Sequence, residues 1–153
     1  MIKVGFIGAG DIAYLHGEGV NASASGELTG IWNRTRSKAE EKAELFGTKV
    51  FDSAEELIDA VDVVYILTNM ETHHSYAMQA IEAGKHVLVE KPTAVTIDEI
   101  EEIKEAAERQ GVQVAPVHNY IYEPSLMRAK DLIESGKLGD IVSIYVLYNI
   151  HHP

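Results

Sequence analysis

Short apolar, β-branched runs alternate along this chain with longer stretches whose apolar residues recur at helical spacing. This alternation is typical of a strand, a crossover helix and a parallel strand, and it limits the chain to α/β architectures. The runs 62–67 and 86–89 are mostly apolar rather than alternating, which indicates strands that are covered on both faces. The sequence therefore predicts a doubly wound parallel sheet.

The same pattern gives each element its range. Strands are predicted at 2–7, 27–33, 48–52, 62–67, 85–89, 112–118 and 140–149. Helices are predicted at 11–22, 35–46, 53–60, 72–83, 96–110 and 124–135. Thr96 and Glu99 form a capping-box pattern at the start of one helix, and Gly111 follows its end. The strand predicted at 140–149 needs neighbouring strands, so it is expected to begin a second sheet.

Composition narrows the classes of protein. The chain has 153 residues, enough for one domain with a substantial core. Its net charge is −11, and the sequence has no run of basic residues that could neutralise a phosphate backbone, so a nucleic-acid partner is not expected. It has no cysteine, which excludes disulfides and cysteine-ligated zinc, and no apolar run near the roughly 18 to 20 residues of a membrane span. We expect a cytoplasmic protein with no membrane partner and no metal site.

The first motif is Gly8-Ala9-Gly10-Asp11-Ile12-Ala13, which follows the first predicted strand and opens the first predicted helix. In this position Gly8 allows a tight turn, and Gly10 lets the backbone approach a pyrophosphate at the helix N-terminus. Residues 8–12 are therefore candidate cofactor ligands. The alternative is a glycine turn between strand and helix that binds nothing.

The second motif is Asn33-Arg34, at the end of the second predicted strand. An acidic residue near this point binds the ribose hydroxyls of NAD, whereas an arginine can hold the 2′-phosphate of NADP. Asn33 occupies the position where an acidic residue is expected, and Arg34 follows it, which favours NADP over NAD. Thr35 and Arg36 are further candidates for the phosphate. The alternative is that Arg34 only stacks on the adenine and that the arginines are solvated.

Two later segments end strands of the predicted sheet, at the edge where such sheets bind ligands. Thr68 and Asn69 are placed to line the cofactor groove, and His73, a further candidate cofactor ligand, falls in the first turn of the next helix. Lys91 ends the fifth strand, where an ammonium group can exchange a proton with an alcohol. On spacing alone, Lys91 can equally be an ordinary surface lysine.

Together these motifs resemble the N-terminal half of the glucose-fructose oxidoreductase/inositol dehydrogenase family, Gfo/Idh/MocA. The resemblance rests on residues 8–13, on Asn33-Arg34, on His73, and most specifically on the run Ala-Gly-Lys-His-Val-Leu-Val-Glu-Lys-Pro at 83–92. Residues 119–124 and 136–141 add to it. Two departures, Asn69-Met70 where the family often has Pro-Asn and Ile121 where it often has Arg, are expected to reshape the pocket.

The resemblance implies a Rossmann-like domain that binds NADP or NAD and an oxidoreductase acting on a CH–OH group of a sugar, cyclitol or related polyol. It implies that Glu90-Lys91-Pro92 is the cofactor and substrate motif, that Lys91 is catalytic, and that a cis peptide bond precedes Pro92. We expect the dinucleotide-binding domain to span 1–120, and 121–153 to begin a truncated α+β second domain.

Because the family completes its active site on that second domain, little or no turnover is expected of this chain. The alternative function is a non-catalytic nucleotide-binding or interaction module that a partner chain completes. An exposed strand is prone to pair with another chain, so homo-oligomerisation through 140–150 is expected.

Overall fold

The computed structural model describes residues 1–147. Six parallel strands form one sheet in the order β3-β2-β1-β4-β5-β6. The strands are β1 (Ile2–Ile7), β2 (Gly26–Trp32), β3 (Lys49–Val50), β4 (Val63–Ile66), β5 (His86–Val89) and β6 (Val114–Pro116). The order reverses direction between β1 and β4, and this confirms the predicted doubly wound, Rossmann-like fold.

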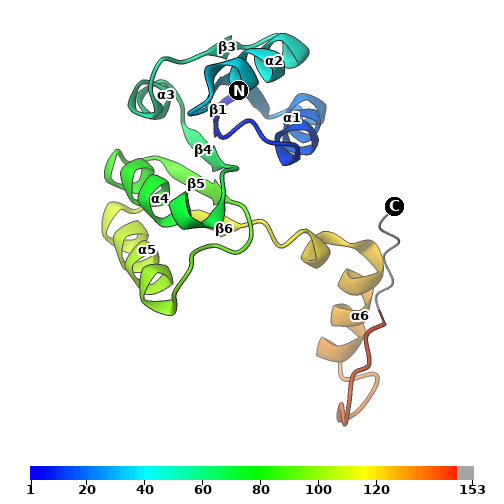
Figure 1. The fold of residues 1–153 in the computed structure, drawn as a ribbon. Coiled ribbons are helices and arrows are strands. Elements are labelled where there is room, and N and C mark those ends of the chain that lie inside the picture. The colour runs from blue at the N-terminus through cyan, green and yellow to red at the C-terminus, as the bar shows by residue number, and fades with distance from the viewer. Residues whose placement is uncertain (148–153) are drawn as a thin grey trace. The chain divides into compact units, whose positions relative to one another are not determined.

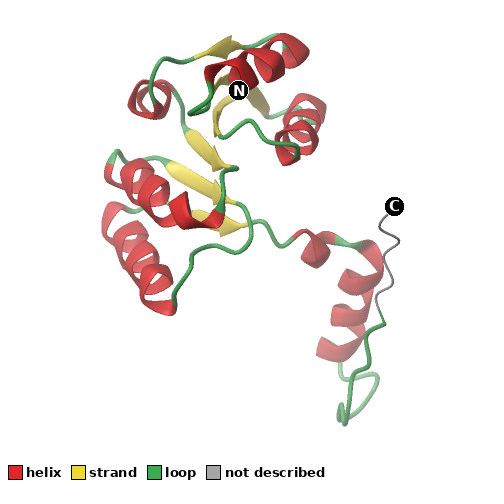
Figure 2. Ribbon diagram, in the orientation of Figure 1, coloured by secondary structure: helices red, strands yellow, loops and turns green. Residues whose placement is uncertain are grey.

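Helices follow the strands and pack on both faces of the sheet (Figure 1). They are α1 (Ile12–Ala22), α2 (Arg36–Phe46), α3 (Ala54–Ala60), α4 (His73–Glu82) and α5 (Ile97–Gln110). Short 3₁₀ turns cover Met70–Thr72 and Asn119–Tyr122, and α6 (Pro124–Glu134) follows β6 along the chain; Figure 2 marks helices, strands and loops by colour. Within residues 1–147, no helix combines the length and hydropathy of a membrane span.

The core has two apolar clusters, one on each face of the sheet, and neighbouring residues of β1 point into different clusters. Phe6 packs with Ala13 of α1 and Ala39 of α2, whereas Ile7 packs on the other face with residues of α3, α4 and α5. Both side chains are fully buried. This double coverage explains why the central strands read as apolar runs rather than as alternating ones.

The chain divides into two compact units, Met1–Val117 and His118–Pro153. The first contains the whole sheet, and the second contains α6, which has no buried residue. The boundaries predicted for the two domains, 1–120 and 121–153, stay predictions.

The strand predicted at 140–149 is wrong over 140–147, which form no strand. Val142 and Tyr145 are more than nine-tenths exposed there. A β-strand is stable only when neighbouring strands satisfy its backbone groups, and the described residues supply none for this segment. Residues 148 and 149 lie outside the described residues.

The predicted capping box at the start of α5 is present. The Thr96 hydroxyl accepts a hydrogen bond from the Glu99 amide at 3.2 Å, and the Glu99 carboxylate accepts one from the Thr96 amide at 3.2 Å. We expect Thr96→Ala to lower the free energy of unfolding by about 1 kcal/mol, because it leaves a helix N–H unsatisfied. Thr96→Ser keeps the hydroxyl and serves as the control. Urea denaturation measures both variants, and equal stability of the alanine and serine variants would contradict this role for the cap.

Candidate functional site

A cleft of about 290 Å³ opens at the carboxyl end of the sheet, beside the point where the strand order reverses. Its walls come from the segments that follow β1, β2 and β4 and from the start of the helices after them. The lining residues are Gly8, Ala9, Gly10, Trp32, Asn33, Arg34, Thr35, Lys38, Leu67, Thr68, Asn69, Thr72 and Tyr76. Open parallel sheets bind their ligands at this place.

The glycine loop closes one end of the cleft. Gly8 has a φ of 110°, and a Cβ there would lie 2.7 Å from the Leu67 backbone, so only glycine fits. At Gly10 the reason is different, because a Cβ would have no atom within 4 Å from any residue beyond its two chain neighbours. The space over Gly10 is open to a ligand that approaches the backbone. Asp11 and Ile12, also predicted as cofactor ligands, are exposed at the start of α1 and do not line the cleft.

Asn33 joins the glycine loop to the loop after β2. Its side-chain oxygen accepts a hydrogen bond from the Ala9 amide at 3.1 Å, and its side-chain nitrogen donates one to the Thr35 carbonyl at 2.9 Å. Both bonds hold the side chain at the cleft wall. The residue that occupies the expected acidic position is therefore a fixed, neutral amide.

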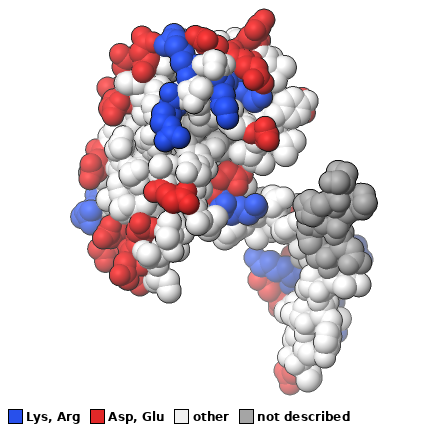
Figure 3. All heavy atoms as spheres, viewed as in Figure 1, with Lys and Arg blue, Asp and Glu red and all other residues white. Residues whose placement is uncertain are grey.

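Arg34 and Lys38 carry the only charges among the lining residues, both of them positive. Within residues 1–147, neither side chain forms a hydrogen bond or an ion pair with another residue. Lys38 comes one helical turn after Arg34, and that spacing is the signal that the sequence prediction overlooked. The cleft is thus locally cationic although the chain carries a net charge of −11. Figure 3 shows Lys and Arg side chains among the more numerous acidic ones.

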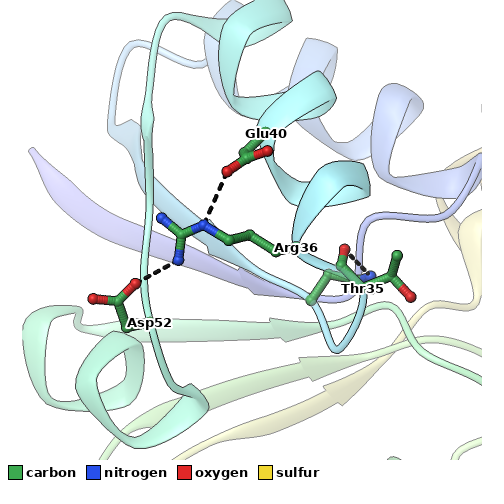
Figure 4. Close-up of polar contacts among 5 residues, drawn as sticks. Thr35, Arg36, Glu40 and Asp52 are labelled. Carbon is green, nitrogen blue, oxygen red and sulfur yellow. Dashed lines mark hydrogen bonds and ion pairs between the residues drawn. The ribbon is translucent and has the colours of Figure 1, made fainter.

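Arg36, a further phosphate candidate in the sequence, does not line the cleft. Its guanidinium lies 2.9 Å from Glu40 and 2.5 Å from Asp52, and Figure 4 shows it between the two carboxylates. Hydrogen bonds to Asp52 and then to Glu40 raise the pKa of Arg36. Sequence reasoning missed this arrangement because Asp52 approaches only after the chain has passed through α2 and β3.

The far wall of the cleft follows β4. Thr68 and Asn69 line it, and the Thr72 hydroxyl donates a hydrogen bond to the Thr68 hydroxyl at 2.8 Å. Tyr76 lies edge-on to Trp32, with ring centroids 5.7 Å apart. Burial, followed by the charge of Glu55, raises the pKa of Tyr76, so this side chain stays a neutral phenol.

The remaining predicted residues form a second group beyond the cleft. Glu90 is buried at the end of β5, and Lys91 and Pro92 are exposed after it, joined by the predicted cis peptide bond. His73 begins α4 as predicted but is only 1% exposed. The structure therefore brings residues 8–10, 33–34 and 68–69 together at one cleft and leaves residues 73 and 90–92 outside its lining.

These features fit a dinucleotide. Gly10 leaves room for a phosphate at the first turn of α1, where helix N–H groups are free to bind an anion. Arg34 and Lys38 can pair with a further anionic group, and the Trp32 and Tyr76 rings offer flat apolar surface. The arrangement suits an elongated ligand with phosphates and aromatic rings.

Comparisons with known proteins agree with this geometry. A family model described as "Oxidoreductase family, NAD-binding Rossmann fold" matches residues 2–118. The chain is 37% identical to the glucose-6-phosphate 3-dehydrogenase of Bacillus subtilis over 95% of this chain and 42% of that protein. It is 32% identical to a scyllo-inositol 2-dehydrogenase (NADP(+)) of the same organism, over 99% of this chain and 43% of that protein.

A solved structure shows the same fold. The crystal structure of an NAD binding oxidoreductase from Klebsiella pneumoniae matches with a TM-score of 0.85 and 32% identity, over 90% of this chain and 40% of that one. The chain thus spans about two fifths of the length of the proteins that it matches.

Proposed function

The chain belongs to the Gfo/Idh/MocA oxidoreductase family and carries that family's NAD-binding Rossmann domain, and on that premise we propose that its cleft binds NADP in preference to NAD. The observation that supports this preference is the pair Arg34 and Lys38, both unpaired within the described residues, in a cleft whose lining has no carboxylate. Two free cations suit a 2′-phosphate, whereas a ribose diol calls for an acceptor such as a carboxylate.

Asn33 supports the same preference. Its side chain is held in place by the Ala9 amide and the Thr35 carbonyl, next to Arg34. A neutral amide does not repel a phosphate, and a carboxylate at the same place would. The pyrophosphate then lies at the Gly8–Gly10 loop, and Thr68 and Asn69 line the groove on the β4 side.

Titrations of the chain with NADPH and NADH at low and high salt test the preference. We expect NADPH to bind more tightly, and high salt to weaken NADPH more than NADH, because salt screens the phosphate contacts. Arg34→Ala is expected to weaken NADPH by about tenfold or more and NADH little, since a hydrogen bond to a charged group is worth about 1.5 to 3 kcal/mol.

Arg36→Ala is the matched control for that variant. It removes the same charge two residues away, from a side chain that is paired with Glu40 and Asp52 and lies outside the cleft lining. It should change NADPH affinity by less than about twofold. Equal binding of NADH and NADPH, or equal losses in the two arginine variants, would overturn the preference.

For the whole protein we extend the proposal to oxidation or reduction of a CH–OH group on a sugar, cyclitol or related polyol, which the names of the two Bacillus relatives support. Bound NAD(P) supplies the hydride acceptor or donor. Lys91, exposed at the end of β5, then exchanges the hydroxyl proton. Glu90, Pro92 and His73, the neighbouring candidate residues, lie on the segments that position Lys91.

Little or no turnover is proposed for this chain by itself, because relatives more than twice its length carry the named activities. Incubation with NADP and a panel of polyols, followed by absorbance of the reduced cofactor, measures this. Reduction at ordinary enzyme rates, about 1 s⁻¹ or faster, would show that the chain holds a complete active site.

An interaction module is the second candidate function, and the apolar exposure of residues 141–147 favours it. The proposed partner is a second copy of this chain, paired through 140–150, of which residues 148–150 lie outside the described residues. Sedimentation at several concentrations should show a dimer, and Tyr145→Lys should weaken it. A monomer at every concentration would contradict the pairing.

A cytoplasmic location is also proposed for the protein. The absence of cysteine supports it, and cell fractionation tests it.

A further inference from the structure

Two polar side chains, His73 and Glu90, are buried in the core of the described residues, where every other buried side chain is apolar or glycine. They are 1% and 7% exposed, respectively. Burial of a polar group is unfavourable unless it is hydrogen-bonded. Both of these side chains form a hydrogen bond with the backbone of the same short segment, Glu90-Lys91-Pro92.

His73 holds the segment from α4. Its Nδ1 lies 2.7 Å from the Pro92 carbonyl oxygen, and its Nε2 lies 3.0 Å from the Thr68 carbonyl oxygen. Carbonyl oxygens only accept, so each ring nitrogen is placed as a donor. The two contacts place Nδ1 toward Pro92 and Nε2 toward Thr68, and the contact with Pro92 is the shorter of the two. His73 thereby ties the residue after Lys91 to the segment that lines the cleft.

Glu90 holds the segment from the other side. One carboxylate oxygen accepts a hydrogen bond from the Lys91 amide at 3.0 Å, and the other lies 2.9 Å from Nε2 of His16 on α1. The His16 ring stands edge-on to Phe6 and Tyr65, which fixes its plane. The backbone of Lys91 is therefore tied through side chains to both α1 and α4.

The Lys91 side chain itself is exposed and, within residues 1–147, makes no hydrogen bond or ion pair. The contacts that hold Lys91 in place are thus made by backbone atoms of Lys91 and Pro92. Apolar side chains of similar volume often stabilise a core as much as buried polar groups do, so stability is a weak reason for the two polar groups at this place.

We propose that His73, Glu90 and His16 form a buried clamp that fixes the backbone of Lys91 and so aims its ammonium group at the nicotinamide end of the cleft. The three are positioning residues. The inference rests on the proposed function, because it needs a cofactor whose nicotinamide end reaches Lys91.

The test measures how far NADPH protects Lys91 from an amine-modifying reagent, with modified peptides quantified by mass spectrometry. At NADPH of about ten times its Kd, a lysine covered by bound cofactor should react about tenfold more slowly. Lys104, whose side chain is 74% exposed on α5, is the internal control and should react at the same rate with and without cofactor.

Two variants of His73 form a matched pair. Asparagine places its amide nitrogen near the Nδ1 position and glutamine near the Nε2 position, so His73→Asn keeps the donor toward Pro92 and His73→Gln keeps only the one toward Thr68. We expect His73→Asn to retain most of the tenfold protection and His73→Gln to reduce it to about twofold or less. Glu90→Gln, which keeps an acceptor for the Lys91 amide, should retain protection that Glu90→Met loses.

NADPH affinity, set at the far end of the cleft by Arg34 and Lys38, should change less than about threefold in all four variants, since none of them touches that end. Circular dichroism identifies any variant that fails to fold, and His16→Asn then takes its place with the same expected loss of protection, because asparagine at this partly exposed position mimics Nδ1 and loses the Nε2 contact with Glu90. Full protection in folded His73→Gln and Glu90→Met chains that bind NADPH overturns the clamp alone. No saturable NADPH binding by the unmodified chain overturns the clamp and the proposed function together.

Discussion

The Gly10→Ala chain is expected to fold normally and to bind NADPH about a hundredfold more weakly. A Cβ at position 10 has no atom within 4 Å from residues beyond its two chain neighbours, and the backbone there needs no positive φ, so the fold tolerates it. The methyl group instead occupies the space through which a pyrophosphate reaches the N-terminus of α1. Loss of one or two hydrogen bonds to phosphate, about 3 kcal/mol, corresponds to that factor. Calorimetric titration with NADPH, beside a thermal melt, measures both properties.

Gly8→Ala is the contrasting variant two residues away. Its Cβ would lie 2.7 Å from the carbonyl carbon and oxygen of Leu67, at a φ of 110° that side chains rarely adopt. The backbone of the β4 end cannot move aside as a flexible side chain can. We expect a loss of about 3 kcal/mol or more in the free energy of unfolding. If Gly8→Ala melted like the unmodified chain, or if Gly10→Ala bound NADPH unchanged, the glycines would not have these two separate roles.

Asn33→Asp is expected to reverse the cofactor preference. The aspartate oxygen can still accept the Ala9 amide, so the loop stays in place, but the hydrogen bond to the Thr35 carbonyl is lost. A new negative charge near the 2′-phosphate costs about 2 to 3 kcal/mol after screening, and the same carboxylate accepts hydrogen bonds from a ribose diol. The ratio of the NADPH and NADH dissociation constants should therefore shift by about a hundredfold toward NADH.

Asn69→Asp is the control for that change of charge. Asn69 lines the same cleft from the β4 side, where its side chain donates a hydrogen bond to Glu71 at 2.9 Å. A carboxylate there should weaken both cofactors by similar factors and leave their ratio unchanged. Parallel losses of NADPH and NADH in the Asn33→Asp chain would contradict the assignment of position 33 to the ribose.

Local signals in the sequence predicted most of the fold because each has a local physical cause. The capping box at Thr96 and the left-handed glycine at position 111 mark both ends of α5. The glycine loop can also be recognised from the sequence, since a tight turn between a strand and a helix requires particular residue types at fixed spacing. The strand predicted at 140–149 is wrong over 140–147 because strand pairing depends on neighbours that lie elsewhere in a structure.

The parts of the site that depend on contacts between residues far apart in the sequence could not be predicted from the sequence. Nothing near Arg36 in the sequence shows that Asp52 will reach it, and nothing near Tyr76 shows that it will meet Trp32. The burial of Glu90 could not be predicted either, because a charged residue next to a lysine is typical of the protein surface. Only the folded chain shows that Glu90 faces His16 and the Lys91 amide.

Trp32 offers the most direct test of the central claim, that the dinucleotide occupies the cleft between the ends of β1, β2 and β4. It is the one tryptophan in the chain, and it lines that cleft. Excited at the tryptophan band, the chain should lose Trp32 emission and gain nicotinamide emission by energy transfer as NADPH is added, saturating at one equivalent. Saturable binding of NADPH in calorimetry without any change in Trp32 emission would place the cofactor elsewhere and contradict the account.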